Sequence, residues 1–258
     1  MLKIKQENIV DVFDSLTGLF DDIGITFDKE GLTIKEADRS MVVFVDVKLK
    51  PSSFEEYGLD QKSQFSVNLT GLVSVLKRFG KEDRISIELK NERLILSNGN
   101  KYFKLPLLAL SEEEKPDVSK LDFKIDLSIK NSVFVEAIKD SNLFAESMVL
   151  DFKGKDLLFK SQDGNGEYQK KLSVGDSDLT AVLNGKGSSR YSLEYLEKIF
   201  RKPFGDKVKI QFGNDFPIKI TFSEDNKEVS YILAPRISDS EEEPTKDKTD
   251  EEEKTTEE

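Results

Sequence analysis

The chain has 258 residues, of which 34% are charged, and it contains no His, Cys or Trp. Without Cys there are no disulfides, no thiolate nucleophile and no Cys-based zinc or iron–sulfur site, and without His there is no imidazole for catalysis or metal binding. Any enzymatic chemistry would therefore depend on carboxylates, Lys, Ser, Thr or Tyr.

The formal net charge of -11 is concentrated at one end of the chain. From Ser238 onward there are 11 acidic residues and three Lys, so this segment alone carries -8. It contains no hydrophobic residue and cannot offset the entropy cost of ordering, so we predict that residues 238–258 form a disordered acidic tail. The remaining body is nearly neutral, with a net charge of -3.

The sequence predicts neither a signal peptide nor a membrane-spanning segment. The first residues lack the apolar run of about 7 to 15 residues that is typical of a signal peptide. No segment approaches the roughly 18 consecutive apolar residues of a membrane-spanning helix. We expect a soluble protein that stays in the cytoplasm.

Two hydrophobic periods alternate along the body. Apolar residues at every second position predict half-buried, mostly antiparallel strands at residues 23–34, 41–49, 84–89, 123–129, 148–160, 208–212 and 229–233. Helical spacing predicts four short helices, at residues 9–19, 69–76, 134–138 and 193–200. This pattern indicates the α+β class.

The pattern repeats within the chain at an offset of about 125 residues. Phe27, Leu32, Lys35 and Asp38 recur as Phe152, Leu157, Lys160 and Asp163, and the second helix of each half matches at an offset of 124. Ordered matches at a nearly constant offset are typical of a duplicated unit. We predict two homologous domains, residues 1–107 and 123–237, joined by a connector at 108–122 whose composition is that of a solvated linker.

Motifs for cofactors and metals are weak. The run Gly185–Ser188 lacks the spacing of a phosphate-binding loop, and the run around Gly164 is typical of a hairpin turn and not of a calcium loop. The acidic residues of the first helical segment and its continuation are expected to form a solvated face. We therefore predict no catalytic residue, no metal site and no cofactor; these carboxylates are Asp11, Asp14, Asp21 and Asp22.

Basic residues gather at the end of the second helix of each half. They are favoured at a helix C-terminus by the macrodipole, by about 0.3 to 1 kcal/mol each, and they would also suit phosphate contacts without base readout. Lys139 on the third helix is a further candidate. The two helix-end sets are Lys77, Arg78 and Lys81 in the first half and Lys198, Arg201 and Lys202 in the second.

Five segments together carry a family resemblance. They are GLTIKEADRSMVVFVDVKL (31–49), LPLLALSEEE (105–114), RYSLEYLEKIF (190–200), FGNDFPIKI (212–220) and YILAPRI (231–237). The combination resembles a sliding clamp of the proliferating cell nuclear antigen type, in its archaeal form. The resemblance implies a non-enzymatic processivity factor, associated with the nucleoid: a ring of three subunits whose helices line a channel for duplex DNA and whose sheets form the outer wall.

The resemblance also implies sites. Residues 100–105 of one subunit would pair with residues 167–172 of the next. The channel cations would be Lys77, Arg78, Lys81, Lys139, Lys198, Arg201 and Lys202. A front-face pocket would bind a Gln-containing, aromatic-ended peptide from DNA polymerase, the clamp loader, flap endonuclease and DNA ligase. Its lining would be Ala37, Met41, Val42, Phe44, Pro116, Val118, Pro217, Ile232, Leu233, Ala234 and Pro235.

Departures from the family pattern leave alternatives open. Many relatives carry His at the position of Met41 and an aromatic residue at that of Ile232, so a more apolar pocket is expected here. The first helix, basic in many relatives, is acidic at Asp11 and Asp14, which allows a heterotrimer in which paralogues supply the missing charge. A rival from another class is a two-domain carboxylate-dependent enzyme or ligand-binding protein with a cleft at the domain joint.

Overall fold

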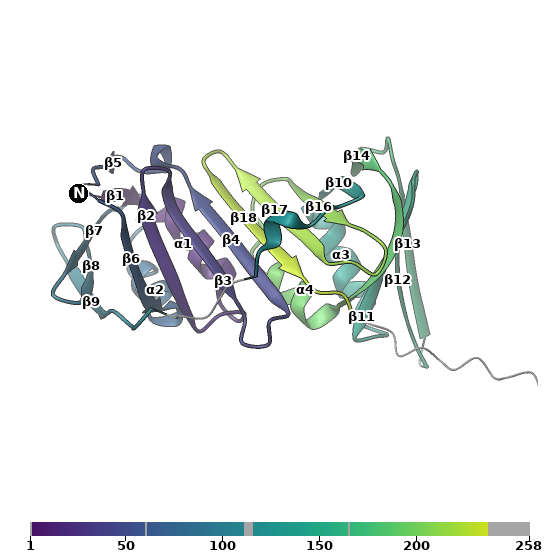
Figure 1. The fold of residues 1–258 in the computed structure, drawn as a ribbon, viewed down its shortest axis with the longest axis horizontal. Helices are drawn as coiled ribbons and strands as arrows, with labels where there is room; N and C mark the ends of the chain where they lie inside the picture. Colours follow the sequence, from purple (N-terminus) through teal and green to yellow (C-terminus); the bar gives the residue numbers. More distant parts are fainter. Residues whose placement is uncertain (1, 60, 111–115, 165, 237–258) are drawn as a thin grey trace, which may run out of the picture.

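The computed structural model describes residues 2–59, 61–110, 116–164 and 166–236. The predicted acidic tail therefore lies outside the described residues, as does part of the connector. No helix in the described ranges is long and apolar enough to cross a membrane. Figure 1 shows two units side by side, with a connector that crosses the sheet surface between them.

The first unit contains nine strands and two α-helices within the described residues. Their order is β1 (Leu2–Lys5), α1 (Gln6–Leu16), β2 (Asp22–Asp28), β3 (Gly31–Ala37), β4 (Val43–Leu49), β5 (Glu56–Tyr57), β6 (Ser63–Asn68), α2 (Leu69–Leu76), β7 (Arg84–Lys90), β8 (Arg93–Ser97) and β9 (Tyr102–Pro106). A 3-10 turn, η1 (Pro51–Ser53), lies between β4 and β5.

The second unit repeats the same order of elements. It runs β10 (Ile125–Lys130), α3 (Asn131–Ser141), β11 (Ser147–Lys153), β12 (Asp156–Asp163), β13 (Gly166–Ser173), β14 (Leu179–Asn184), β15 (Lys186–Ser192), α4 (Leu193–Ile199), β16 (Lys207–Phe212), β17 (Ile218–Glu224) and β18 (Lys227–Leu233). The connector contains the 3-10 turn η2 (Val118–Lys120). A duplicated fold follows from this order, in agreement with the repeat in the sequence.

The sheets show the same duplication. The five-stranded order β5-β1-β7-β8-β9 of the first unit corresponds to β14-β10-β16-β17-β18 of the second, and β6-β2-β3-β4 corresponds to β15-β11-β12-β13. Between the units, β18 pairs antiparallel with β4, which fuses two of these sheets into one of nine strands. The strands that correspond to this joined pair, β9 and β13, lie at the edges of their own sheets.

Strand alternation decides which side of the sheet faces the helices. Val43, Val45 and Val47 of β4 are at most 1% exposed and belong to a hydrophobic core that runs through both units. Helix α1 packs into this core through Val12 and Phe13. Burying each such side chain contributes about 1.5 to 3 kcal/mol to the free energy of unfolding. Apolar burial, and not the intrinsic helix propensity of such short helices, therefore stabilises the fold.

Buried amides start the first helix of each unit. The Gln6 side chain donates to the Leu76 carbonyl (3.2 Å), and the Asn131 side chain donates to the Gly205 carbonyl (2.8 Å). The Gln6 bond reaches the last residue of α2, whereas the Asn131 bond reaches the turn between α4 and β16. The N–H groups of the same two residues donate to the carbonyls of Asp83 and Asp206, which directly precede β7 and β16, and this backbone hydrogen bond is the one that the duplication repeats.

Helices α2 and α4 end at or within one residue of the predicted positions, and most of the basic residues assigned to their ends lie beyond them. Helix α2 is capped at its start by the Asn68 side chain, which accepts from the Gly71 N–H (2.9 Å), and its last residue is Leu76. Lys77 is its C-cap, so Arg78 and Lys81 lie beyond the helix. Gly80, which is a poor helix former, follows the helix end. Except for Lys198, which lies within α4, the basic residues of the two helix-end sets are thus presented by the turns after the helices.

Tyr231 links the two units from within the core. Its hydroxyl donates to the carbonyl and hydroxyl oxygens of Ser15 in α1, both at 3.1 Å, and the side chain is fully buried. Tyr231→Phe is expected to lower the free energy of unfolding by about 0.5 to 1.5 kcal/mol, because the Ser15 carbonyl loses a buried donor. Urea denaturation of both proteins measures the difference, and an unchanged free energy of unfolding would show that the bond contributes nothing.

Candidate functional site

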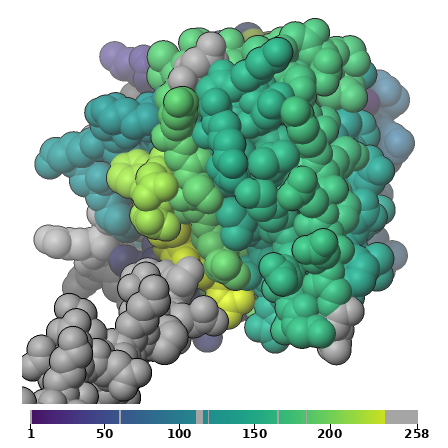
Figure 2. Space-filling model, turned by 90° about the vertical axis from the view of Figure 1, so that its right-hand side faces the viewer, coloured from purple at the N-terminus to yellow at the C-terminus, as the bar shows by residue number. Residues whose placement is uncertain are grey.

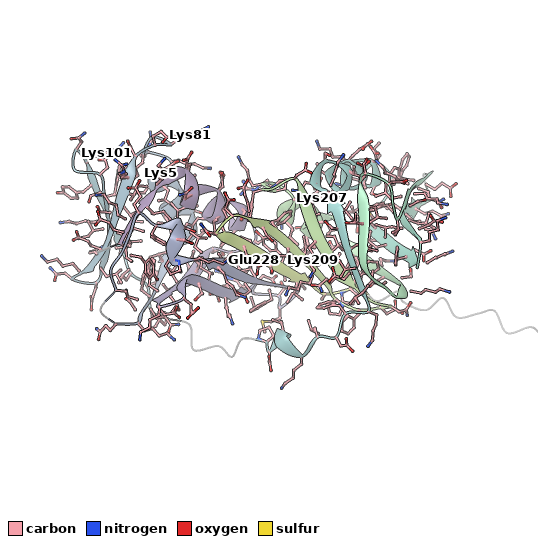
Figure 3. The ribbon with its side chains drawn as sticks, turned by 90° about the horizontal axis from the view of Figure 1, so that it is seen from above. Lys5, Lys81, Lys101, Lys207, Lys209 and Glu228 are labelled. Atoms are coloured by element: carbon pink, nitrogen blue, oxygen red, sulfur yellow. The ribbon has the colours of Figure 1, made fainter. Side chains whose placement is uncertain are left out.

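The helices and the connector occupy opposite sides of the sheets. Figure 3 shows this arrangement from above, with the helices along the upper edge and the connector below. Lys81 lies at the upper left corner together with Lys101, a cation that the sequence did not single out. The Lys101 ammonium donates to the Arg78 carbonyl and lies 5.0 Å from the centre of the Phe79 ring. Lys101 lies in the hairpin turn between β8 and β9, which brings it to the end of α2, so the helical pattern of the sequence could not indicate it.

Three of the predicted channel cations converge on one carboxylate. The Asp14 carboxylate is 3.0 Å from the Lys77 ammonium, 3.5 Å from the Arg201 guanidinium and 3.9 Å from the Lys202 ammonium. Arg201 also donates to the Asp14 carbonyl and to the Thr17 hydroxyl. These cations come from both units, so Asp14 lies where α1 meets the ends of α2 and α4.

Asp14 is 3% exposed, which corrects the expectation of a solvated acidic face. Burial alone would raise the pKa of its carboxyl, but the hydrogen bond from Lys77 and the charges of Lys77, Arg201 and Lys202 outweigh that effect and hold the pKa below its ordinary value. The other carboxylates of that set do not join it. Asp21 pairs with Arg39 at 3.1 Å, and Asp22 accepts from the Asn68 amide. These carboxylates therefore do not form the cluster that the rival carboxylate-dependent site would need.

The remaining predicted cations differ in their surroundings. Arg78, Lys81 and Lys139 are exposed on the helix side, at the ends of α2 and α3. Lys198 is half-buried, pairs with Glu194 at 2.7 Å and lies 5.4 Å from the Tyr195 ring centre. Its charge is therefore less available to a ligand than those of the first three.

A groove of about 800 Å³ separates the start of α4 from the final residues of the fold. It brings together three residues predicted for the peptide pocket, Val42, Ala234 and Pro235. It adds residues that the sequence did not indicate; they lie at the β15–α4 junction, in α4, around the end of α3 and, for Arg236, directly after Pro235. These are Asn142, Ala145, Glu146, Ser192, Leu193, Glu194, Tyr195, Glu197 and Arg236.

Asp38 fixes the loop that carries one wall of this groove. Its carboxylate accepts from the Val42 and Val43 N–H groups at 2.7 and 2.8 Å, and from the Tyr195 hydroxyl at 3.0 Å. The Ala234 N–H donates to the Val42 carbonyl at 2.9 Å, which joins the C-terminal strand to the same loop. Met41 occupies the loop with a positive φ of 55° and an exposure of 58%.

Other predicted pocket residues form a separate row on the outer face of the sheet. Ala37, Phe44 and Ile232 are paired neighbours across β3, β4 and β18, and the last two are buried although they lie outside the main core. The connector passes in front of β17 and β18 on this side (Figure 1). In the connector, Val118 is half-buried and Pro116 is exposed. Pro217, just before β17, is half-buried.

Leu233 does not belong to either surface. It is 0% exposed and lies in the main core, because strand alternation in β18 turns it to the side opposite Ile232. The structure therefore places the predicted pocket residues in two adjoining regions, the groove beside α4 and the outer row under the connector, and removes Leu233 from both.

The two edge strands lie at opposite ends of the molecule (Figure 1). At the ends of the β8–β9 ladder, Asn98 donates to the Lys101 carbonyl and Leu107 donates to the Glu92 carbonyl. Antiparallel alternation between these bonds turns the backbone groups of Tyr102 and Lys104 outward.

The edge of β13 shows the same alternation. The Val174 N–H donates to the Lys155 carbonyl, so the backbone groups of Glu167, Gln169 and Lys171 point outward. Figure 2 looks onto this end, whose visible surface is mostly that of the second unit. Both ends thus present strand edges with outward-facing hydrogen-bonding groups.

Comparison with known proteins identifies the family. Residues 1–103 match the family model described as "Proliferating cell nuclear antigen, N-terminal domain". The DNA polymerase sliding clamp of Methanothrix thermoacetophila is 31% identical over 245 residues, which cover 92% of this chain and 99% of the relative. The chain belongs to the family of DNA polymerase sliding clamps. The resemblance read from the sequence is thereby confirmed.

Solved structures agree with this clamp in fold. A chain of the PCNA2–PCNA3 complex from Sulfolobus tokodaii aligns with a TM-score of 0.79 at 25% identity, covering 91% of the clamp and 98% of that chain. A. fulgidus PCNA bound to the C-terminal region of FEN-1 aligns with a TM-score of 0.83 at 20% identity, covering 92% and 99%. The α+β clamp fold predicted from the sequence is confirmed.

Proposed function

We propose that this clamp closes a three-subunit ring around duplex DNA by pairing β9 of one subunit with β13 of the next. The observation that carries the proposal is the β18–β4 pair inside the chain. Because β9 corresponds to β18 and β13 to β4, the same antiparallel contact can be repeated between subunits. A head-to-tail contact of this kind closes a ring when its rotation divides a full turn.

The ring holds DNA by topology and not by tight binding. Cations at the ends of the helices contact phosphates without reading bases, and such contacts are weak and sensitive to salt. Strong binding would oppose sliding. The clamp acts as a binding platform without catalysis of its own.

Exposed cations of the helix side are expected to provide these phosphate contacts. Changing Arg78, Lys81 and Lys139 to Ala should weaken DNA binding and make the slope of log affinity against log salt shallower by about 0.9 for each phosphate that is no longer neutralised. DNA polymerase stimulation should fall in parallel. Binding of a short linear duplex, followed by fluorescence anisotropy over a salt series, measures both the affinity and the slope.

The matched control changes cations on the other face of the sheet. Lys48 and Lys219 lie in the strand positions that face away from the helices, so Lys48→Ala with Lys219→Ala should leave DNA binding unchanged. Equal effects of the two sets would refute the assignment of the helix side to DNA.

Partner enzymes are expected to bind through the groove beside α4 and the outer row. Apolar side chains beside polar groups, as in the lining of this groove, suit a surface that receives an inserted peptide side chain. The FEN-1 peptide bound to A. fulgidus PCNA supports flap endonuclease as one partner class. DNA polymerase, clamp loader and DNA ligase are proposed to use the same surface.

A ring of mixed subunits is the second arrangement to test, and the PCNA2–PCNA3 complex of Sulfolobus tokodaii supports it. Light scattering of the purified chain alone, and then with each related clamp chain of the same genome, separates the two arrangements. A trimer mass for the chain alone supports the homotrimer. A trimer mass only in mixtures supports the heterotrimer, and a single-chain mass in all samples would refute the ring.

A further inference from the structure

The carboxylate of Asp14 is a feature of the DNA-facing side that the proposed function does not use. It is buried, yet its three ion-pair partners are about half exposed: their side chains retain 52% (Lys77), 43% (Arg201) and 51% (Lys202) of their accessible surface. A buried acid thus lies beneath three cations that reach the surface. Its position at the junction of the two units fixes where those cations lie.

We infer that Asp14 is a positioning residue of the DNA-facing surface, which holds Lys77, Arg201 and Lys202 at the junction of the units and lowers the attraction of the channel for DNA. This inference rests on the proposed ring around DNA. It divides the seven predicted cations into a held set of three and a freer set that includes Arg78, Lys81 and Lys139.

The physical reason lies in competition for the same donors. A phosphate that approaches Lys77 must share an ammonium group that already lies 3.0 Å from a carboxylate. The carboxylate cannot release its partners freely, because a buried charge left unpaired is strongly unfavourable. The junction therefore offers DNA a net charge of +2 from four charged groups, where the cations alone would offer +3.

Further contacts show that the cations are held in fixed positions and are not only attracted to the charge of Asp14. Arg201 donates to the Asp14 carbonyl and to the Thr17 hydroxyl, so its guanidinium is fixed by three groups of the first unit. Tyr231 packs nearby and binds Ser15, the residue after Asp14. The held cations are therefore oriented by the domain junction and not only attracted to it.

The first test removes the charge of Asp14 in the full-length ring. Asp14→Asn should tighten binding of a short linear duplex and steepen the salt slope by about 0.9 for each additional phosphate neutralised, or about eightfold in affinity over a tenfold range of salt. The matched control is Asp11→Asn, which makes the same chemical change on the same helix at an exposed position. Asp14→Glu, which keeps the charge, should restore the original slope.

A second test leaves the buried group intact, in case Asp14→Asn does not assemble. Lys77→Gln and Lys81→Gln remove the same charge from neighbouring exposed residues, but only Lys77 is held by Asp14. The inference predicts a clearly smaller loss of DNA affinity for Lys77→Gln than for Lys81→Gln. Light scattering confirms the ring for each variant before binding is measured.

The outcomes separate this inference from the proposed function. If Asp14→Asn matches Asp11→Asn and the two Lys variants lose affinity equally, Asp14 has only a structural role and the inference fails, while the ring around DNA stands. If the combined change of Arg78, Lys81 and Lys139 to Ala also has no effect, the DNA-facing assignment itself is wrong.

Discussion

Lys104→Pro is expected to convert the ring into single chains while each chain stays folded. The Lys104 N–H points away from β8, so proline removes a donor that the sheet of the same subunit does not use. The proposed partner strand β13 would lose a hydrogen bond and meet the proline ring at the centre of the subunit boundary. Light scattering should show the mass of one chain, and the circular dichroism spectrum should be unchanged.

Two variants serve as controls for this result. Lys104→Ala removes the side chain and keeps the N–H, so it should remain a ring. Phe103→Pro removes a donor on the opposite side of the strand, toward β8, and should destabilise the first unit itself. A Lys104→Pro protein that keeps the trimer mass would contradict the proposed β9–β13 pairing.

The sequence predicted the features that depend on periodicity. Alternation predicted β2, β3, β4, β7, β10, β11, β12, β16 and β18 but not the other strands of the described residues. The constant offset of about 125 residues predicted two copies of one unit, which the matching strand orders of the sheets show. The duplication also extends to a detail that was not predicted, since the N–H groups of Gln6 and Asn131 repeat one backbone hydrogen bond, to the carbonyls of Asp83 and Asp206.

Features that depend on contacts between distant segments could not be predicted from the periodicity of the sequence. Asp14 has the sequence context of an exposed helical acid, and only the approach of α2 and α4 gives it three cationic partners. The groove beside α4 likewise joins residues near positions 42, 145, 193 and 235. The family resemblance indicated part of that lining, because Val42, Ala234 and Pro235 lie in motifs that the family shares.

Ala234→Asp is expected to weaken binding of partner peptides strongly without opening the ring. The added carboxylate would enter a groove whose lining already carries Glu146, Glu194 and Glu197, and it would replace a methyl group with a charge that the bound peptide must desolvate. Disrupting a central anchor of this kind costs about 2 kcal/mol or more, a roughly thirtyfold weaker Kd. Calorimetric titration with a Gln-containing, aromatic-ended peptide measures the change.

Two further variants test whether the effect comes from the position of the new carboxylate or from the introduction of a carboxylate as such. Val182→Asp places a carboxylate on an apolar residue that is 73% exposed and lies on β14, away from the groove, so it should leave the peptide Kd unchanged. Val118→Asp tests the connector: a loss of affinity equal to that of Ala234→Asp would show that the peptide spans both the groove and the outer row.

If Ala234→Asp binds as tightly as the parent clamp, the groove beside α4 is not the partner site. A loss of affinity in Val118→Asp alone would then place the peptide on the outer row, beside Phe44 and Ile232.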